Sequence, residues 1–388
     1  MRFVQLILLS VIPVAAQSVV ADGSRLPSRV RFEAQPGELP LRCEITPIKP
    51  TLNYGFRFQA GYVVTIPLIQ YSGKGNRLMI LSRVTPKGGK PVFFAQGLLL
   101  PEIPPDAPTN KQQIDTGGNY LMGEGQYDVD WLLVDNQRRV CRKKWTSIAE
   151  LKGSSKKVKA AIPSNTVTDL SLRGVPLPTP EDEDVRKLNL TVLMHATPMS
   201  SRRNVFRPSD EAMLLGTLSA LMGRIPTASV RLVIFNLEQH REIFRRNGFQ
   251  LSDLDDASVA LQKVDLNAVD YSVLKNKAGH IDLLADLVNQ EQNPEAPNQK
   301  QSDVVIFLGP MARHLDKPPA DVIEAPRGIL PRFFYFRFES FFRRNPNAGL
   351  PDAINFAVKK VKGKSLVIHT PIEFSNAIEQ VIAKVNQS

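Results

Sequence analysis

The chain has 388 residues, of which 43% are hydrophobic and 22% are charged, as is usual for a soluble globular protein. This length suffices for two ordinary domains. Composition excludes a chain with internal membrane spans, because no run after the N-terminus is long and apolar enough to cross a bilayer.

The N-terminus has the features of a secretory signal peptide. Arg2 precedes an apolar stretch, and the small residues Ala15 and Ala16 follow it. We therefore expect residues 1–16 to be removed and the mature protein to be secreted or periplasmic. Export also makes nucleic acid an improbable class of partner. The net charge of +11, or +10 without Arg2, leaves polyanions and cell surfaces as alternative partners.

The chain contains two cysteines, Cys43 and Cys141. In an oxidising compartment an even pair favours a disulfide, and the long loop that it closes gives a stabilisation of ~4–5 kcal/mol. Two buried free thiols are the alternative. The two residues lack the spacing of a zinc or redox motif.

Residues 25–150 are predicted to form an all-β sandwich with an immunoglobulin- or fibronectin-like pattern of roughly seven strands. Large side chains at Tyr127, Val129, Trp131 and Leu133 alternate as one face of a strand would require. Short apolar runs separated by turn residues predict further strands at 29–33, 41–45, 54–58, 62–66, 77–81 and 92–95.

Residues 151–187 are rich in lysine, proline and acidic residues, which predicts a polar, stiff linker. From residue 188 to 388, predicted strands and helices alternate, which indicates a three-layer α/β domain with a mainly parallel, Rossmann-like sheet. Ser209 is the expected N-cap of the first helix. The expected strands are 188–195, 229–235, 240–244 at the sheet edge, 303–308, 333–338 and 365–369, and the expected helices are 209–222, 251–264, 280–289, 350–361 and 373–385.

The stretch from Leu190 to Ser201, followed by a helix that opens at Pro208, resembles the start of a von Willebrand factor A domain. The order of the later elements, including the edge hairpin, is similar to that family over roughly half of the chain. The resemblance implies a metal site at the carboxyl ends of the strands, with an Asp-x-Ser-x-Ser motif in the first loop. It also implies that these loops hold a partner.

Several family ligands are replaced in this sequence. The first-loop positions carry His195, Thr197 and Met199, the second-loop position carries His280, and the third loop has Gly309 where the family has a carboxylate. Magnesium and calcium need several hard oxygen ligands, which a single hydroxyl cannot replace. We therefore expect a degenerate metal-ion-dependent adhesion site with no bound divalent cation and no cofactor.

Two replaced positions are histidines, which permits an alternative. His195 and His280 could bind zinc or copper if the loops meet, and His369 ends a strand on the same side. A metal-binding protein or hydrolase that uses these three residues is the second hypothesis. His195 could instead fill the vacated pocket and form local hydrogen bonds.

The leading hypothesis is an exported, non-catalytic module for protein–protein interaction or adhesion, with another protein or an envelope component as partner. No enzyme motif is evident, so no catalytic residue is assigned. Aromatic and arginine side chains are enriched at interfaces, and the loops after the strands supply several. The candidate binding residues are Ser200, Arg202, Arg203, Arg313, Phe341, Phe342, Arg343 and Arg344.

Overall fold

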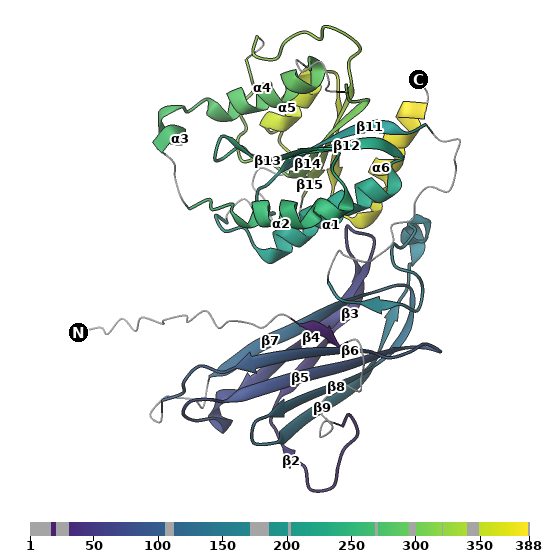
Figure 1. The fold of residues 1–388 in the computed structure, drawn as a ribbon, viewed down its shortest axis with the longest axis vertical. Helices are drawn as coiled ribbons and strands as arrows, with labels where there is room; N and C mark the ends of the chain where they lie inside the picture. The colour runs from purple at the N-terminus through teal and green to yellow at the C-terminus, as the bar shows by residue number, and fades with distance from the viewer. Residues whose placement is uncertain are drawn as a thin grey trace, which may run out of the picture. The chain divides into compact units, whose positions relative to one another are not determined.

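The computed structural model describes residues 17–20, 31–104, 112–170, 186–200, 203–267, 271–294, 300–319, 321–339 and 349–386. These residues form two compact units, which we call the sandwich unit and the α/β unit. The sandwich unit contains strands β1 to β10, and the α/β unit contains strands β11 to β16 and helices α1 to α6 (Figure 1). No helix in the described part of the chain is long and apolar enough to span a membrane.

The sandwich unit is built from two sheets. One has the strand order β1-β6-β5-β8-β9-β2, and the other has the order β10-β7-β4-β3. Tyr62 of β4 and Trp131 of β8 bring the two sheets together edge to face, with ring centroids 5.5 Å apart. The strands are β1 (Ser18–Val20), β2 (Leu39–Pro40), β3 (Glu44–Leu52), β4 (Phe58–Pro67), β5 (Arg77–Pro86), β6 (Val92–Leu99), β7 (Gln113–Met122), β8 (Gly125–Asp135), β9 (Arg139–Ala149) and β10 (Val167–Thr168).

The predicted alternation in β8 is confirmed, since Tyr127, Val129, Trp131 and Leu133 are all buried. Three other strand predictions need correction. Residues 31–33 form no strand, only Glu44 and Ile45 of the predicted strand 41–45 lie in β3, and residues 54–57 form a turn before β4. The described part of the unit has ten strands rather than seven, and β10 lies within the predicted linker.

The predicted disulfide between Cys43 and Cys141 is confirmed, and the two cysteines lie 98 positions apart in the sequence. It connects the segment before β3 to β9. Both side chains pack against the apolar core that Tyr62 and Trp131 share.

The α/β unit has one six-stranded sheet with the order β13-β12-β11-β14-β15-β16. All neighbouring pairs are parallel except β12 and β13, which form the antiparallel edge that the sequence predicts. The strands are β11 (Leu188–His195), β12 (Thr227–Asn236), β13 (Arg241–Asn247), β14 (Val304–Pro310), β15 (Arg332–Phe338) and β16 (Lys364–Ile368). Every residue of β14 is buried, as expected for a parallel strand covered on both faces.

Helices cover both faces of this sheet. Figure 1 shows α4 and α5 on one face and α1, α2 and α6 on the other. The helices are α1 (Pro208–Arg224), α2 (Leu254–Gln262), α3 (Tyr271–Lys275), α4 (Gly279–Gln292), α5 (Ala353–Lys360) and α6 (Pro371–Asn386). Ser209 is not the N-cap of α1. Arg207 holds that position, and its backbone N–H donates to the Asp210 carboxylate at 3.0 Å.

The disulfide predicts a large and localised change in stability. Changing both Cys43 and Cys141 to Ser should lower the free energy of unfolding of the sandwich unit by ~4–5 kcal/mol, because the open chain gains conformational entropy when unfolded. Both tryptophans of the chain, Trp131 and Trp145, lie in this unit, so urea titration followed by tryptophan fluorescence isolates it.

The α/β unit supplies the control in the same sample. The α-helices of the described residues all lie in that unit, so α-helical circular dichroism follows its unfolding separately. Its transition should not move in the double variant. An unchanged tryptophan transition would contradict a stabilising role for the disulfide.

Candidate metal centre

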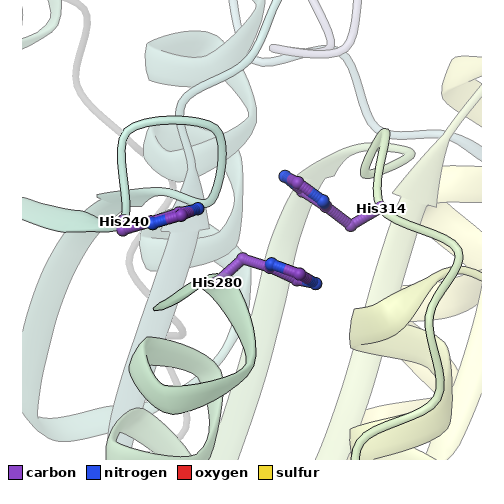
Figure 2. Close-up of side chains that lie close together, drawn as sticks. All are labelled: His240, His280 and His314. Carbon is purple, nitrogen blue, oxygen red and sulfur yellow. The ribbon is translucent and has the colours of Figure 1, made fainter. Parts of the chain in front are cut away.

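Three histidines meet at the carboxyl edge of the parallel sheet. His240 lies in the turn between β12 and β13, and His280 is the second residue of α4. His314 lies four residues beyond the end of β14. Figure 2 shows the three side chains facing a common space from these three segments.

The three imidazoles are close enough to share one ion. Each offers one ring nitrogen that lies within 4.8 Å of the other two. The rings of His280 and His314 are stacked, with centroids 3.9 Å apart and planes inclined by 14°. The ring of His240 lies 5.8 Å from that of His280 and 6.3 Å from that of His314.

Three of the six ring nitrogens in this cluster are buried and have no hydrogen-bond partner among the described residues. His280 is only 3% exposed, yet neither of its ring nitrogens makes a hydrogen bond. The Nε2 atom of His314 is likewise buried and without a partner. The Asp316 carboxylate lies 3.4 Å from Nε2 of His280. Buried polar groups without partners cost about 1–3 kcal/mol each, a cost that a bound ion would offset.

The surroundings of His240 and His314 disfavour protonation of both imidazoles. Burial, followed by the proximity of His280, lowers the pKa of His314 to about 4. The same two causes lower the pKa of His240. At neutral pH, His240 and His314 therefore each retain an imidazole lone pair, which metal binding requires.

The backbone around His240 is constrained. Its φ of 50° is in the left-handed region, which costs energy for a residue other than glycine. Across from it stands Gly279, where an added Cβ atom would lie 2.4 Å from Nδ1 of His240. Only glycine at position 279 leaves the His240 ring in this place.

These residues fit a zinc-class ion. Imidazole nitrogen is a preferred ligand of zinc, copper and nickel, and a tetrahedral ion with bonds of about 2.05 Å places its ligand nitrogens ~3.3 Å apart. Because the stacked rings of His280 and His314 hold their in-plane lone pairs nearly parallel, one of the two rings must rotate out of the stack to bind a shared ion.

The positions that correspond to the von Willebrand factor A metal site in the predicted resemblance lie on the same edge of the sheet and make other contacts. His195 is buried and stacks on Phe235 with ring centroids 5.2 Å apart, while its Nε2 lies 3.5 Å from the Glu238 carboxylate. Thr197 donates to the other oxygen of Glu238 at 3.4 Å. Gly309 packs so tightly that an added Cβ atom would lie 2.7 Å from the His195 carbonyl oxygen, so no carboxylate fits there.

Glu238 supplies a negative charge beside His195 and Thr197. Burial raises its pKa, but the hydrogen bond and charge of His195, with the charge of Arg313, outweigh this effect and bring the pKa to about 2. At the third of these positions, the backbone N–H of Met199 donates to the Asp210 carboxylate at 3.2 Å.

The structure describes three of the candidate binding residues. Arg203 forms an ion pair with Asp210 at 3.1 Å, and Arg313 donates to Asn204 at 3.0 Å and lies 3.7 Å from Glu238. Ser200 is half-buried in the loop after β11. Arg202, Phe341, Phe342, Arg343 and Arg344 lie outside the described residues.

The predicted trio of His195, His280 and His369 is not brought together. Only His280 belongs to the cluster, whereas His195 faces Glu238 and Nδ1 of His369 lies 3.3 Å from the Glu339 carbonyl oxygen. Sequence reasoning missed His240 and His314. A usable signal existed, because all five histidines of the chain lie near strand ends or helix starts on this edge.

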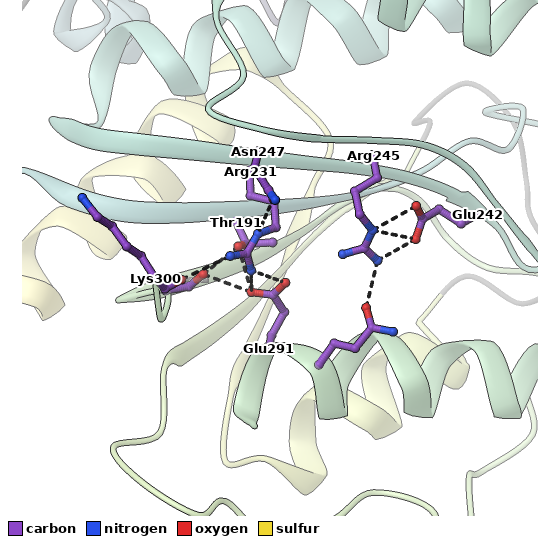
Figure 3. Close-up of polar contacts among 9 residues, drawn as sticks. Thr191, Arg231, Glu242, Arg245, Asn247, Glu291 and Lys300 are labelled. Atoms are coloured by element: carbon purple, nitrogen blue, oxygen red, sulfur yellow. Dashed lines mark hydrogen bonds and ion pairs between the residues drawn. The ribbon is translucent and has the colours of Figure 1, made fainter. Parts of the chain in front are cut away.

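A second buried polar cluster in the α/β unit provides a contrast (Figure 3). Arg231 of β12 donates to both carboxylate oxygens of Glu291 at 2.8 Å, and Thr191 and Ser302 also donate to Glu291. Arg231 further donates to Asn247 at 2.9 Å. This carboxylate is fully satisfied, so we assign the cluster to structure rather than to ligand binding.

Changing Glu291 to Gln should destabilise the α/β unit by about 3–5 kcal/mol, because the variant leaves a buried guanidinium without its counter-charge. The matched control is Glu242→Gln, which breaks a partly exposed pair with Arg245 and should cost at most about 1 kcal/mol. Urea unfolding followed by helical circular dichroism measures both. Equal effects would contradict the structural assignment.

No protein-family model and no curated protein matches the chain. Among solved structures, the putative ApaA protein from Bordetella pertussis is similar at 10% identity and a TM-score of 0.21, over 30% of this chain and 99% of that chain. A glycosyl hydrolase family 2 member from Bacteroides cellulosilyticus is similar at 10% identity and a TM-score of 0.21, over 83% of this chain and 37% of that chain. The periplasmic chaperone SfaE is similar at 14% identity and a TM-score of 0.16, over 39% of this chain and 66% of that chain. Similarities this weak carry no argument about function.

Proposed function

We propose that the α/β unit is a metal-binding module that holds a zinc-class ion at His240, His280 and His314. The observation that carries the proposal is the convergence of three imidazoles whose buried nitrogens include three without hydrogen-bond partners. The lowered pKa values of His240 and His314 support it, since protons compete weakly there with a metal.

We further propose that this unit is a von Willebrand factor A-like domain. The strand order, with β11 central and the antiparallel β13 at one edge, supports that resemblance. In this proposal the family's own metal position at His195, Thr197 and Met199 is degenerate. The new ion would lie on the same edge of the sheet, beside that position and on different residues.

We also propose that the protein acts outside the cytoplasm, in the periplasm or after secretion. The disulfide between Cys43 and Cys141 supports an oxidising compartment. The predicted signal peptide, residues 1–16, lies outside the described residues.

Metal-independent recognition of a protein partner is the second candidate function. It is favoured by the loop after β11, which Asp210 braces through the Met199 backbone and the Arg203 side chain. A braced loop loses little conformational entropy on binding. Ser200, Arg203 and Arg313 would then form the contact.

The metal proposal is tested by titrating the full chain with Zn²⁺ in a calorimeter. We expect one ion per chain. His280→Ala should weaken binding by more than the roughly 10- to 100-fold that loss of an outer-shell partner causes, because it removes a direct ligand. His369→Ala is the matched control and should leave binding unchanged. Tight binding that survives His280→Ala would contradict the assignment, and so would a loss caused by His369→Ala.

The structure offers a second variant that leaves every ligand in place. Gly279→Ala should displace the His240 ring and weaken Zn²⁺ binding by roughly ten-fold or more, since a ring nitrogen and the new methyl group cannot both fit. Gly328→Ala is the control, because an added Cβ atom there meets nothing within 4 Å. Equal affinities for the two variants would contradict the proposed position of His240.

A further inference from the structure

We infer that the ion keeps an open coordination position that carries a reactive water, so that the site can hydrolyse carboxylic esters. This inference rests on the metal proposal and adds an activity to it. Sites with three protein ligands hold a water or substrate in the fourth position, whereas structural zinc sites are closed by four protein ligands.

The first step is the number of protein ligands. Among the described residues, the cluster that can share an ion contains three histidines and no carboxylate. Asp282 of α4 is engaged, because its carboxylate accepts from Asn276 at 3.0 Å. Glu238 is not part of this cluster and lies 3.5 Å from His195, 3.4 Å from Thr197 and 3.7 Å from Arg313.

Asp316 is the remaining carboxylate that could close the site. Its side chain is 69% exposed, and its oxygen lies 3.4 Å from Nε2 of His280. That position suits an outer-shell acceptor, which receives the second ring N–H of a ligating histidine and fixes the orientation of the ring. We assign Asp316 this positioning role, which leaves the fourth place on the ion to water.

The second step is access. His280 is buried, but His240 and His314 are half-buried. The cluster lies at the carboxyl ends of the strands, where open α/β sheets receive their ligands. A water molecule and a small substrate can therefore approach the ion from the solvent side.

The third step is the chemistry. Three neutral imidazoles leave the double positive charge of the ion uncompensated, and such an ion lowers the pKa of its water to about 7. The resulting hydroxide forms a C–O bond with the ester carbonyl carbon. The bond from that carbon to the alcohol oxygen then breaks, the alkoxide takes a proton from solvent, and a new water binds the ion. No electrons are transferred.

The experiment uses the full chain loaded with Co²⁺ for spectroscopy and with Zn²⁺ for hydrolysis. Azide should change the visible absorption of the Co²⁺ protein, because it displaces an exchangeable water. The Zn²⁺ protein should hydrolyse p-nitrophenyl acetate roughly ten-fold or more faster than His280→Ala. Asp316→Asn should retain the azide response, since Asp316 is not a ligand of the ion.

The outcomes separate this inference from the proposal beneath it. Failure of Co²⁺ and Zn²⁺ to bind would overturn both. Bound Co²⁺ with a spectrum that ignores azide would overturn only the open position, and an azide response gained on Asp316→Asn would identify Asp316 as the ligand that closes the site. An azide response without hydrolysis above His280→Ala would overturn the activity.

Discussion

The parallel pairing of β11 with β12 and β14 is the constraint on which the candidate centre depends. His195 is paired with Phe235, and Met194 with Leu308, so the three strands end at one edge. The turns that follow then bring His240 and His314 to the start of α4. A slip of two residues moves a strand by about 6.6 Å, more than the 4.8 Å that spans the ligand atoms.

The presence of paired charges separates the clusters of the α/β unit by role. The Glu291 carboxylate accepts from Arg231, Thr191 and Ser302, and the Glu238 carboxylate is held by His195, Thr197 and Arg313. Both charges are compensated within the protein. Among the described residues, no carboxylate belongs to the His240, His280 and His314 cluster, and three of its ring nitrogens are buried without a hydrogen-bond partner. A bound cation would provide the partner that the imidazole nitrogens of that cluster lack. We expect no cation at Glu238, because Arg313 already provides the positive charge there.

The sequence predicted strands that have a regular apolar pattern and missed strands that lack one. β11 matches its predicted bounds because seven of its eight residues are buried and most of them are apolar. β7 was not predicted because it contains Gly117 and Gly118 and many polar residues, and its pairing with neighbouring strands is what identifies it as a strand.

The residues of the candidate site were likewise predicted only where a local sequence pattern marks them. His280 was identified by its place at a helix start, but His240 and His314 lie in turns, where no periodicity marks them. Their proximity arises from tertiary structure.

The position of the ion is the most direct test of this account. Crystals of the full chain grown with Zn²⁺ should be measured on both sides of the zinc absorption edge. We expect one anomalous peak about 2.1 Å from a ring nitrogen of each of His240, His280 and His314. A peak on His195 or His369, or no peak at the three histidines, would contradict the central claim.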